Sequence, residues 1–132
     1  MYIPEGYGTV FPYLVVGDAR KLIDFLGAVF DAKELGRTEL PDGRIANMQA
    51  NIGTTNFMIA EPDSGVLKAM PCAHYVYVED VDGVLEKALA HGATKLFDAA
   101  DMPYGDRQAG IADPFGNLWW ISRRLVQEDY GD

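Results

Sequence analysis

Tyr13-Leu14-Val15-Val16-Gly17-Asp18 combines a short apolar, β-branched run with a glycine and an acidic residue. Such a run is typical of a buried strand, and the apolar positions 22, 25, 26, 29 and 30 that follow have the spacing of one helix face. Asp18 is the expected helix N-cap, because its carboxylate can accept hydrogen bonds from the free amides of the first turn. The stretch therefore predicts a strand that leads directly into an amphipathic helix.

The same pattern returns 62 residues later, from Tyr13 to Tyr75. The run Tyr75-Val76-Tyr77-Val78-Glu79-Asp80 again precedes apolar residues at helical spacing. Further along each copy, strand-like runs separated by glycine-containing turns match at an offset of 63 residues, which aligns Arg44 with Arg107 and Phe57 with Trp120. Each half is therefore predicted to be a strand, a helix and a strand meander, and repeated halves usually pack face to face.

The composition is that of a single soluble domain over residues 1–132. A chain of 132 residues that is 48% hydrophobic can bury one core, and no apolar run approaches the ~18 residues that cross a bilayer. The N-terminus has no basic region followed by an apolar stretch, so we expect a cytoplasmic protein with no membrane partner. A net charge of −9 would repel nucleic acid. The lone Cys72 excludes an internal disulfide and a cysteine-based metal site.

Four segments carry a resemblance to a known family. They are Pro12-Tyr13-Leu14-Val15-Val16, residues 25–32, residues 77–82, and Gly105-Asp106-Arg107 with Asp113-Pro114-Phe115-Gly116-Asn117-Leu118-Trp119-Trp120. Over nearly its whole length the chain resembles the PhnB-like branch of the vicinal-oxygen-chelate superfamily, which includes glyoxalases, bleomycin-resistance proteins and dioxygenases. It departs from the family pattern at Leu26, Asp31 and Asn117, where Tyr, Gly and His are common.

The resemblance implies an α+β fold built from two βαβββ modules, about residues 8–62 and about residues 70–126. In this fold, curved mixed sheets enclose a cavity and the helices lie outside. The resemblance also implies a homodimer. It does not fix the activity, because members of the superfamily range from metal-dependent enzymes to metal-free proteins that sequester drugs.

In the metal-dependent members, His, Gln or Glu ligands from the first and last strands of each module converge on a divalent ion. Matching the motifs places four residues at these positions: Phe11, Phe57, Ala73 and Trp120. A register shifted by one residue, which exposes the other face of each strand, gives Pro12, Met58, His74 and Ile121. A divalent ion needs three or four donors at about 2 Å, which neither set supplies, so we expect no metal and no other cofactor.

Strand alternation predicts which side chains face the cavity. Leu14, Val16, Val76 and Val78 suit packing beneath the helices, which turns Tyr13, Val15, Tyr75 and Tyr77 the other way. The predicted ligand-binding residues are Phe11, Tyr13, Phe57, Tyr75, Tyr77, Tyr104, Arg107, Leu118 and Trp120. Such a lining favours a flat or bulky apolar ligand, and aromatic faces also attract cations.

Several of these residues have a structural alternative. Arg107 is either a structural ion pair at a strand end or an anchor for an anionic or carbonyl group of the ligand. Tyr104 either covers the cavity or is an ordinary exposed loop residue. Phe57 and Trp120 either line the cavity or fill it as core. Because neighbouring side chains on a strand point to opposite faces, only one indole of the Trp119-Trp120 pair can face the cavity.

The first function hypothesis is a metal-free binding protein that sequesters an aromatic or cationic drug-like molecule, as antibiotic-resistance members of the family do. The second is an enzyme of the glyoxalase, isomerase or dioxygenase kind. It would use an atypical metal site around His74 or acid–base chemistry at Tyr75, Tyr77 and Arg107, although no residue is assigned as catalytic. A third is an accessory module whose pocket is filled.

Overall fold

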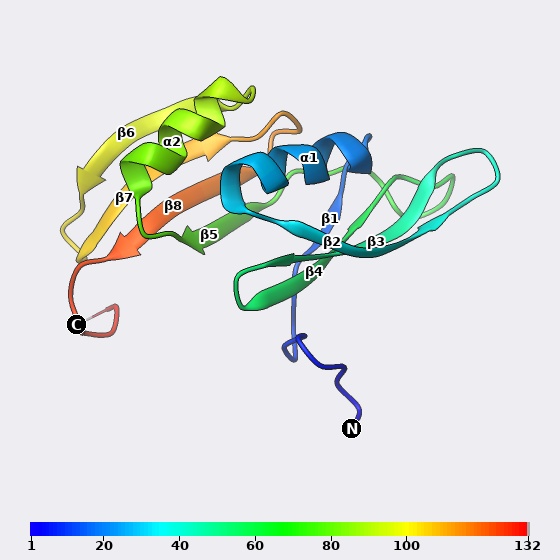
Figure 1. Ribbon diagram of the computed structural model, residues 1–132, viewed down its shortest axis with the longest axis horizontal. Coiled ribbons are helices and arrows are strands. Elements are labelled where there is room, and N and C mark those ends of the chain that lie inside the picture. The colour runs from blue at the N-terminus through cyan, green and yellow to red at the C-terminus, as the bar shows by residue number, and fades with distance from the viewer. Residues whose placement is uncertain (132) are drawn as a thin grey trace. The chain divides into compact units, whose positions relative to one another are not determined.

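The computed structural model describes residues 1–131, which form two compact units, Met1–Pro71 and a second unit that begins at Cys72. Each unit has the element order strand, helix and three strands. The predicted α+β fold of two βαβββ modules is therefore confirmed, with a mixed four-stranded sheet in each unit (Figure 1).

The first unit is a sheet with the strand order β1-β4-β3-β2 and one helix. Its elements are β1 (Tyr13–Val15), α1 (Ala19–Phe30), β2 (Lys33–Glu39), β3 (Ile45–Ile52) and β4 (Thr55–Ala60). Strands β2, β3 and β4 are antiparallel neighbours, whereas β1 pairs with β4 in parallel. The first and last strands of the unit thus lie side by side.

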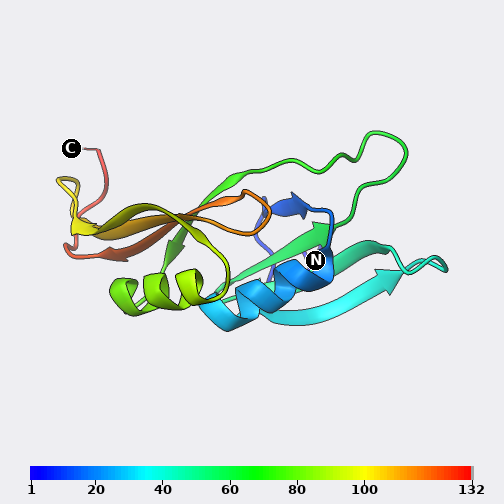
Figure 2. The same cartoon turned by 90° about the horizontal axis from the view of Figure 1, so that it is seen from above.

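The second unit repeats this arrangement, with the strand order β5-β8-β7-β6. Its elements are β5 (Ala73–Tyr77), α2 (Val81–Ala90), β6 (Thr94–Asp101), β7 (Asp106–Ala112) and β8 (Leu118–Arg124). Helix α2 packs along one face of β6, β7 and β8 (Figure 2). Among residues 1–131, neither helix has the length and apolar character needed to cross a membrane.

The start and end of α1 follow from local side-chain chemistry. Asp18 is the N-cap as predicted, and its Oδ1 accepts a hydrogen bond of 3.0 Å from the backbone amide of Lys21. Asp31 ends the helix in the left-handed conformation, with φ of 57°. Glycine adopts this conformation without steric penalty, so an aspartate here costs about 1–2 kcal/mol.

The motif that begins at Asp113 is a structural turn between β7 and β8. The buried Asp113 carboxylate accepts hydrogen bonds from the backbone amides of Phe115 and Asn117, the Asn117 side chain and the Trp119 indole, at 2.8–3.1 Å. Gly116 occupies the left-handed region with φ of 83°, where other residues would be strained. The motif therefore fixes the hairpin that positions β8.

The two modules share the same pairing of first and last strands. Tyr13 pairs with Met58 and Tyr75 pairs with Trp120, so the counterpart of Trp120 is Met58, at an offset of 62. The offset of 63 that aligns Phe57 with Trp120 is wrong by one residue, and a slip of one residue reverses the face of a strand. Phe57 is accordingly 3% exposed in the core instead of facing a cavity.

A buried carboxylate joins α1 to the sheet of the first unit. Glu61, 8% exposed, accepts hydrogen bonds from the backbone amides of Ala19 at 2.8 Å and Ile45 at 2.7 Å. It therefore satisfies a free amide at the N-terminus of the helix and one at the start of β3 with a single side chain.

We expect Glu61→Gln to lower the free energy of unfolding by about 1–3 kcal/mol, because the amide group replaces one of the two acceptor oxygens with a donor. Urea denaturation followed by circular dichroism measures the change. Glu39→Gln is the matched control, since Glu39 is 47% exposed in its ion pair with Arg20 and its loss should cost under about 0.5 kcal/mol. Equal effects of the two substitutions would contradict the role given to Glu61.

Candidate functional site

A pocket of about 420 Å³ lies in the second unit and is lined by aromatic side chains. The lining residues are Tyr75, Tyr77, Tyr104, Trp120 and Tyr130. Tyr75, Tyr77 and Trp120 come from the adjacent strands β5 and β8, where they alternate with the buried core residues Val76 and Ile121. The pocket therefore lies on the sheet face opposite α2.

Tyr104 and Tyr130 reach the pocket from irregular segments. Tyr104 belongs to the turn between β6 and β7, and Tyr130 belongs to the segment of residues 125–131 that follows β8. The turn brings Gly105 so close to that segment that a Cβ atom on it would lie 2.8 Å from Val126. With φ of 94° as well, position 105 requires glycine for both its conformation and its space.

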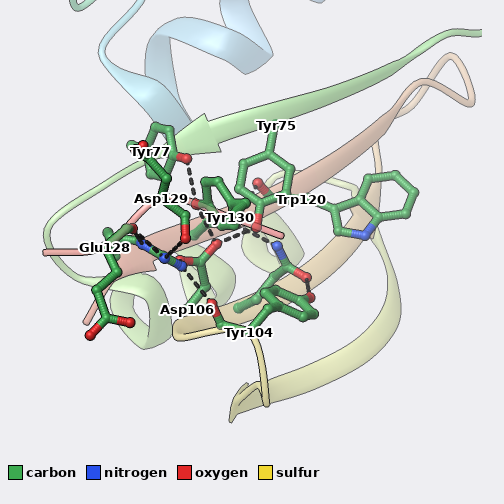
Figure 3. A network of polar contacts seen from close by, with 11 residues as sticks. Tyr75, Tyr77, Tyr104, Asp106, Trp120, Glu128, Asp129 and Tyr130 are labelled. Carbon is green, nitrogen blue, oxygen red and sulfur yellow. Dashed lines mark hydrogen bonds and ion pairs between the residues drawn. The ribbon is translucent and has the colours of Figure 1, made fainter. Parts of the chain in front are cut away.

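A buried carboxylate, Asp106, lies beside the tyrosines that line the pocket (Figure 3). Its Oδ2 accepts hydrogen bonds from the hydroxyl of Tyr75 and, at 2.7 Å, from the hydroxyl of Tyr130. Its Oδ1 accepts one of 3.1 Å from Nη1 of Arg124. Two phenols and one guanidinium thus compensate the loss of water around this charge.

Arg124 connects Asp106 to the segment that carries Tyr130. Its guanidinium donates to the backbone carbonyl of Glu128 through Nε at 3.1 Å and through Nη2 at 2.5 Å, and to the carbonyl of Tyr104 at 2.6 Å. It also lies 4.0 Å from the centroid of the Tyr130 ring, a cation–π contact. One side chain therefore holds the turn, the carboxylate and the segment 125–131 together.

A second polar chain runs along the sheet face. The hydroxyl of Tyr104 donates to Oε1 of the buried Gln108, whose Nε2 donates to the hydroxyl of Ser122 at 2.8 Å. Ser122 in turn donates to the backbone carbonyl of Trp120 at 3.2 Å. These bonds fix Tyr104 over the sheet. The ring of Trp120 presents its apolar surface to the pocket.

The protonation states follow from this network. Burial by itself would raise the pKa of Asp106, but the hydrogen bonds from Tyr75, Tyr130 and Arg124 outweigh it and hold that pKa below its usual value. Burial, followed by the hydrogen bond to Asp106, raises the pKa of Tyr75. At neutral pH the site therefore contains an ionised carboxylate and protonated phenols.

Four of the nine predicted ligand-binding residues line the pocket, namely Tyr75, Tyr77, Tyr104 and Trp120. Trp120 is half-buried, whereas Trp119 is 5% exposed with its indole N–H bound to Asp113, so Trp120 is the indole that faces the pocket. Leu118 lies on the same side of β8 as Trp120 but outside the lining. The structure thus brings together the aromatic residues predicted in the second half.

Arg107 lies on the opposite face of the sheet from Asp106, because the two are neighbours on β7. Its guanidinium donates to both carboxylate oxygens of Asp82 in α2, at 2.8 and 2.9 Å, and to Asp101 at 3.0 Å. Two roles were predicted for Arg107, and the geometry matches the structural ion pair. These bonds engage the N–H donors of its guanidinium on the side of the sheet away from the pocket.

The remaining predicted residues belong to the first unit. Phe11 packs against Tyr7 with ring centroids 4.8 Å apart, and the Tyr13 hydroxyl accepts a hydrogen bond of 3.3 Å from Asn47. Val15, expected to face the cavity, is 5% exposed. Val15 also pairs with Met70 in an isolated antiparallel bridge.

Three residues of the site were missed by reasoning from the sequence: Asp106, Arg124 and Tyr130. A signal existed for Asp106, because alternation requires that Asp106 and Arg107 point to opposite faces. Arg124 lies at an even position of β8, like Trp120 and Ser122, which also indicates the pocket face. Tyr130 follows the last strand in an irregular segment, where no periodicity exists to place it.

The donors on this sheet face do not fit a divalent metal. Asp106 is the carboxylate within reach of the pocket, and its oxygens already accept three hydrogen bonds. Nowhere in residues 1–131 do three or more His, Cys, Asp or Glu side chains gather as an ion would require.

Cys72 and His74 form a second polar pair in the same unit, with Sγ and Nε2 3.2 Å apart. Burial raises the pKa of the Cys72 thiol and lowers the pKa of His74, so both groups are neutral near pH 7. A reactive cysteine needs a thiolate stabilised by a positive neighbour, which is the reverse of this arrangement. The pair is therefore a packing contact, with His74 stacked 4.6 Å from Trp119.

The sequence comparison identifies the family. Residues 8–121 match the model of the Glyoxalase/Bleomycin resistance protein/Dioxygenase superfamily. The chain belongs to this superfamily. Uncharacterised proteins of Mycobacterium tuberculosis and Mycobacterium bovis are 37% identical to it over 122 residues, covering 85% of this chain and 72% and 80% of theirs, respectively.

Two solved structures share the fold. TioX from Micromonospora sp. ML1 superposes with a TM-score of 0.72 at 27% identity, over 89% of this chain and 100% of that one. The fosfomycin resistance protein FosX from Listeria monocytogenes superposes with a TM-score of 0.70 at 20% identity, over 91% and 95% of the two chains. At the latter identity the similarity shows the fold alone.

We expect Asp106→Asn to lower the free energy of unfolding at pH 7 by about 2–4 kcal/mol, because Arg124 and the two phenols lose their charged partner. The pKa of Asp106 is depressed in the folded state, so its contribution is complete above the unfolded value of about 3.9 and is lost as the pH falls through the folded value. The stability difference between wild type and variant should therefore be constant above about pH 5 and shrink from there toward pH 2.

Chemical denaturation at several pH values measures this difference. Asp98→Asn provides the control, because Asp98 is 79% exposed in its pair with Lys95 and should change stability little at any pH. A difference between wild type and Asp106→Asn that stays constant down to pH 2 would show that Asp106 is not held ionised by its partners.

Proposed function

We propose that the protein binds a small aromatic or cationic organic molecule in the pocket of its second unit and holds it without chemical change. The observation that carries the proposal is the lining of Tyr75, Tyr77, Tyr104, Trp120 and Tyr130 around a space of about 420 Å³. Small-molecule sites are typically apolar hollows of this order of size with a few fixed polar groups. The superfamily includes resistance proteins, which supports sequestration as the biological role.

The lining suits a flat ligand. Tyr75 and Tyr77 pack with ring centroids 5.5 Å apart, and Tyr75 and Tyr130 with centroids 6.2 Å apart, so the rings form a connected wall of apolar faces and edges. Each face can stack on an aromatic ligand or attract a cation, with about 0.5–2 kcal/mol per contact. The net charge of −9 adds an attraction for positively charged molecules.

Acid–base catalysis receives less support than binding. A general acid or base works best when its pKa lies near the working pH. In this site the pKa of Asp106 is lowered and that of Tyr75 is raised, so both pKa values lie further from pH 7 than usual. Arg107, which was named with Tyr75 and Tyr77 for acid–base chemistry, is engaged with Asp82 and Asp101. We therefore place binding before an enzymatic role.

Finer parts of the proposal rest on the sequence. The Gly105-Asp106-Arg107 and Asp113-Pro114-Phe115-Gly116 motifs favour the PhnB-like branch, and a Bacillus cereus protein named as PhnB shares the fold at 16% identity with a TM-score of 0.67. We also propose a homodimer, as the resemblance implies, and a cytoplasmic location, which suits a chain with a single free cysteine. Light scattering on the purified protein tests the dimer.

We expect the wild-type protein to bind indole or benzyltrimethylammonium, one a neutral and the other a cationic aromatic probe. Trp120→Ala should weaken that binding by about 3- to 10-fold, because one ring contact is worth about 0.5–1.5 kcal/mol. Isothermal titration calorimetry measures both affinities.

Tyr2→Ala is the control, since Tyr2 is 94% exposed and lies in the first unit. It should bind both probes as tightly as the wild type does. If neither probe binds, or if both bind Trp120→Ala and wild type equally, this pocket is not the binding site.

A further inference from the structure

Tyr130 lines the pocket and is held there by contacts that resemble those of a bound molecule. It belongs to the segment 125–131, which contains no helix or strand, and its side chain is 46% exposed. Despite this exposure, its hydroxyl reaches the buried carboxylate of Asp106 at 2.7 Å (Figure 3). A half-exposed residue on an irregular segment thus hydrogen-bonds to a fully buried carboxylate.

Each part of the Tyr130 side chain has a partner on the rigid part of the site. The hydroxyl donates to Asp106 and lies 2.5 Å from the hydroxyl of Tyr77, from which it accepts. One edge of the ring meets Tyr75 in a T-shaped contact, and the guanidinium of Arg124 lies over its face. The sheet therefore supplies an acceptor, a donor, an aromatic wall and a cation, arranged around one phenol group.

The attachment of the segment is local and can be released. Leu125 donates its backbone amide to the carbonyl of Gly105 at 2.8 Å, which fixes the start of the segment beside the turn. Beyond this point, the contacts shown run from Arg124 to the carbonyls of Glu128 and Asp129 and from the Tyr130 side chain to the site. These are exchangeable hydrogen bonds at exposed backbone, the kind of region that opens at low free-energy cost.

We propose that Tyr130 is an internal occupant of a site for hydroxyaryl compounds, and that a ligand with a phenolic hydroxyl displaces it. The inference rests on the proposed function and narrows it to one ligand class. A phenolic ligand would donate to Asp106, accept from Tyr77 and stack beneath Arg124, so it would replace every contact that Tyr130 gives up. An aromatic molecule without the hydroxyl would leave Asp106 with one donor fewer, which is costly for a buried charge.

Displacement of a tethered group follows the arithmetic of competition. A ligand binds with an apparent affinity reduced by the fraction of molecules whose site is vacant, and removing the tethered competitor restores the full affinity. Removing the Tyr130 ring should therefore tighten binding of a phenol, although it also removes part of the pocket wall. A gain in affinity distinguishes an occupant from a wall, since loss of a wall residue weakens binding.

The experiment compares p-cresol with toluene, which has the same ring and methyl group but no hydroxyl. Calorimetric titrations are made with wild type, Tyr130→Ala and Tyr130→Phe, and with Leu125→Ala as a control in the same segment, whose side chain is 47% exposed. We expect Tyr130→Ala to bind p-cresol at least about threefold more tightly than wild type. The same substitution should raise the affinity for toluene by a smaller factor. Leu125→Ala should bind p-cresol and toluene as tightly as wild type does.

Tyr130→Phe keeps the ring but loses the hydrogen bond to Asp106, so its affinity for p-cresol should lie between those of wild type and Tyr130→Ala. In wild type, saturation with p-cresol should move the backbone amide signals of residues 128–131 in a ¹H–¹⁵N spectrum toward those of an unstructured chain. Both measurements report release of the segment and do not depend on any enzymatic activity.

Two results would overturn the inference while leaving the proposed function in place. In the first, Tyr130→Ala binds p-cresol no more tightly than wild type although indole or benzyltrimethylammonium still binds. In the second, Tyr130→Ala raises the affinities for p-cresol and for toluene by the same factor. Tyr130 would then be a steric cover without selectivity for hydroxyl groups. If no variant binds any of the four probes, the proposed function itself fails.

Discussion

The parallel pairing of the first and last strands of each module is the constraint on which the rest of the structure depends. In each unit the paired residues are 45 positions apart, Tyr13 with Met58 and Tyr75 with Trp120. A parallel pair cannot be closed by a hairpin and requires a long connection, here a helix and two strands. Once this pairing is set, alternation decides which side chains are buried beneath the helix and which remain on the open face.

The same scaffold carries different chemistry on the open faces of its two sheets. In the first unit, Asn47 on β3 donates a hydrogen bond to the hydroxyl of Tyr13, and Asn51 on β3 donates one to the side-chain amide of Asn56 on the neighbouring β4. In the second unit, the corresponding region holds aromatic rings and one carboxylate. Side chains on an open sheet face do not bear on the core, and they can therefore diverge between modules while the pairing and the buried residues stay alike.

The sequence was sufficient for the order of the elements, the N-cap at Asp18 and the aromatic residues of β5 and β8, because each depends on local pattern and alternation. It failed at Phe57, since turns tolerate insertions and a repeat aligned through a turn can slip by one residue, which reverses the face of the strand. It also failed at Tyr130. The position of that ring is set by its hydrogen bond to Asp106 and its cation–π contact with Arg124, which are tertiary contacts without a periodic signature.

The Gly105-Asp106-Arg107 motif shows how a family signature combines structural and functional roles. Gly105 provides a conformation and a clearance that a side chain would prevent. Arg107 points toward α2, where its ion pairs with Asp82 and Asp101 fasten the helix to β6 and β7. Asp106 points to the other face, where it is held ionised among Tyr75, Tyr130 and Arg124. Because adjacent residues on one strand serve opposite faces, the motif can be retained for the fold in proteins whose pockets differ, and its presence indicates the scaffold more strongly than it indicates the ligand.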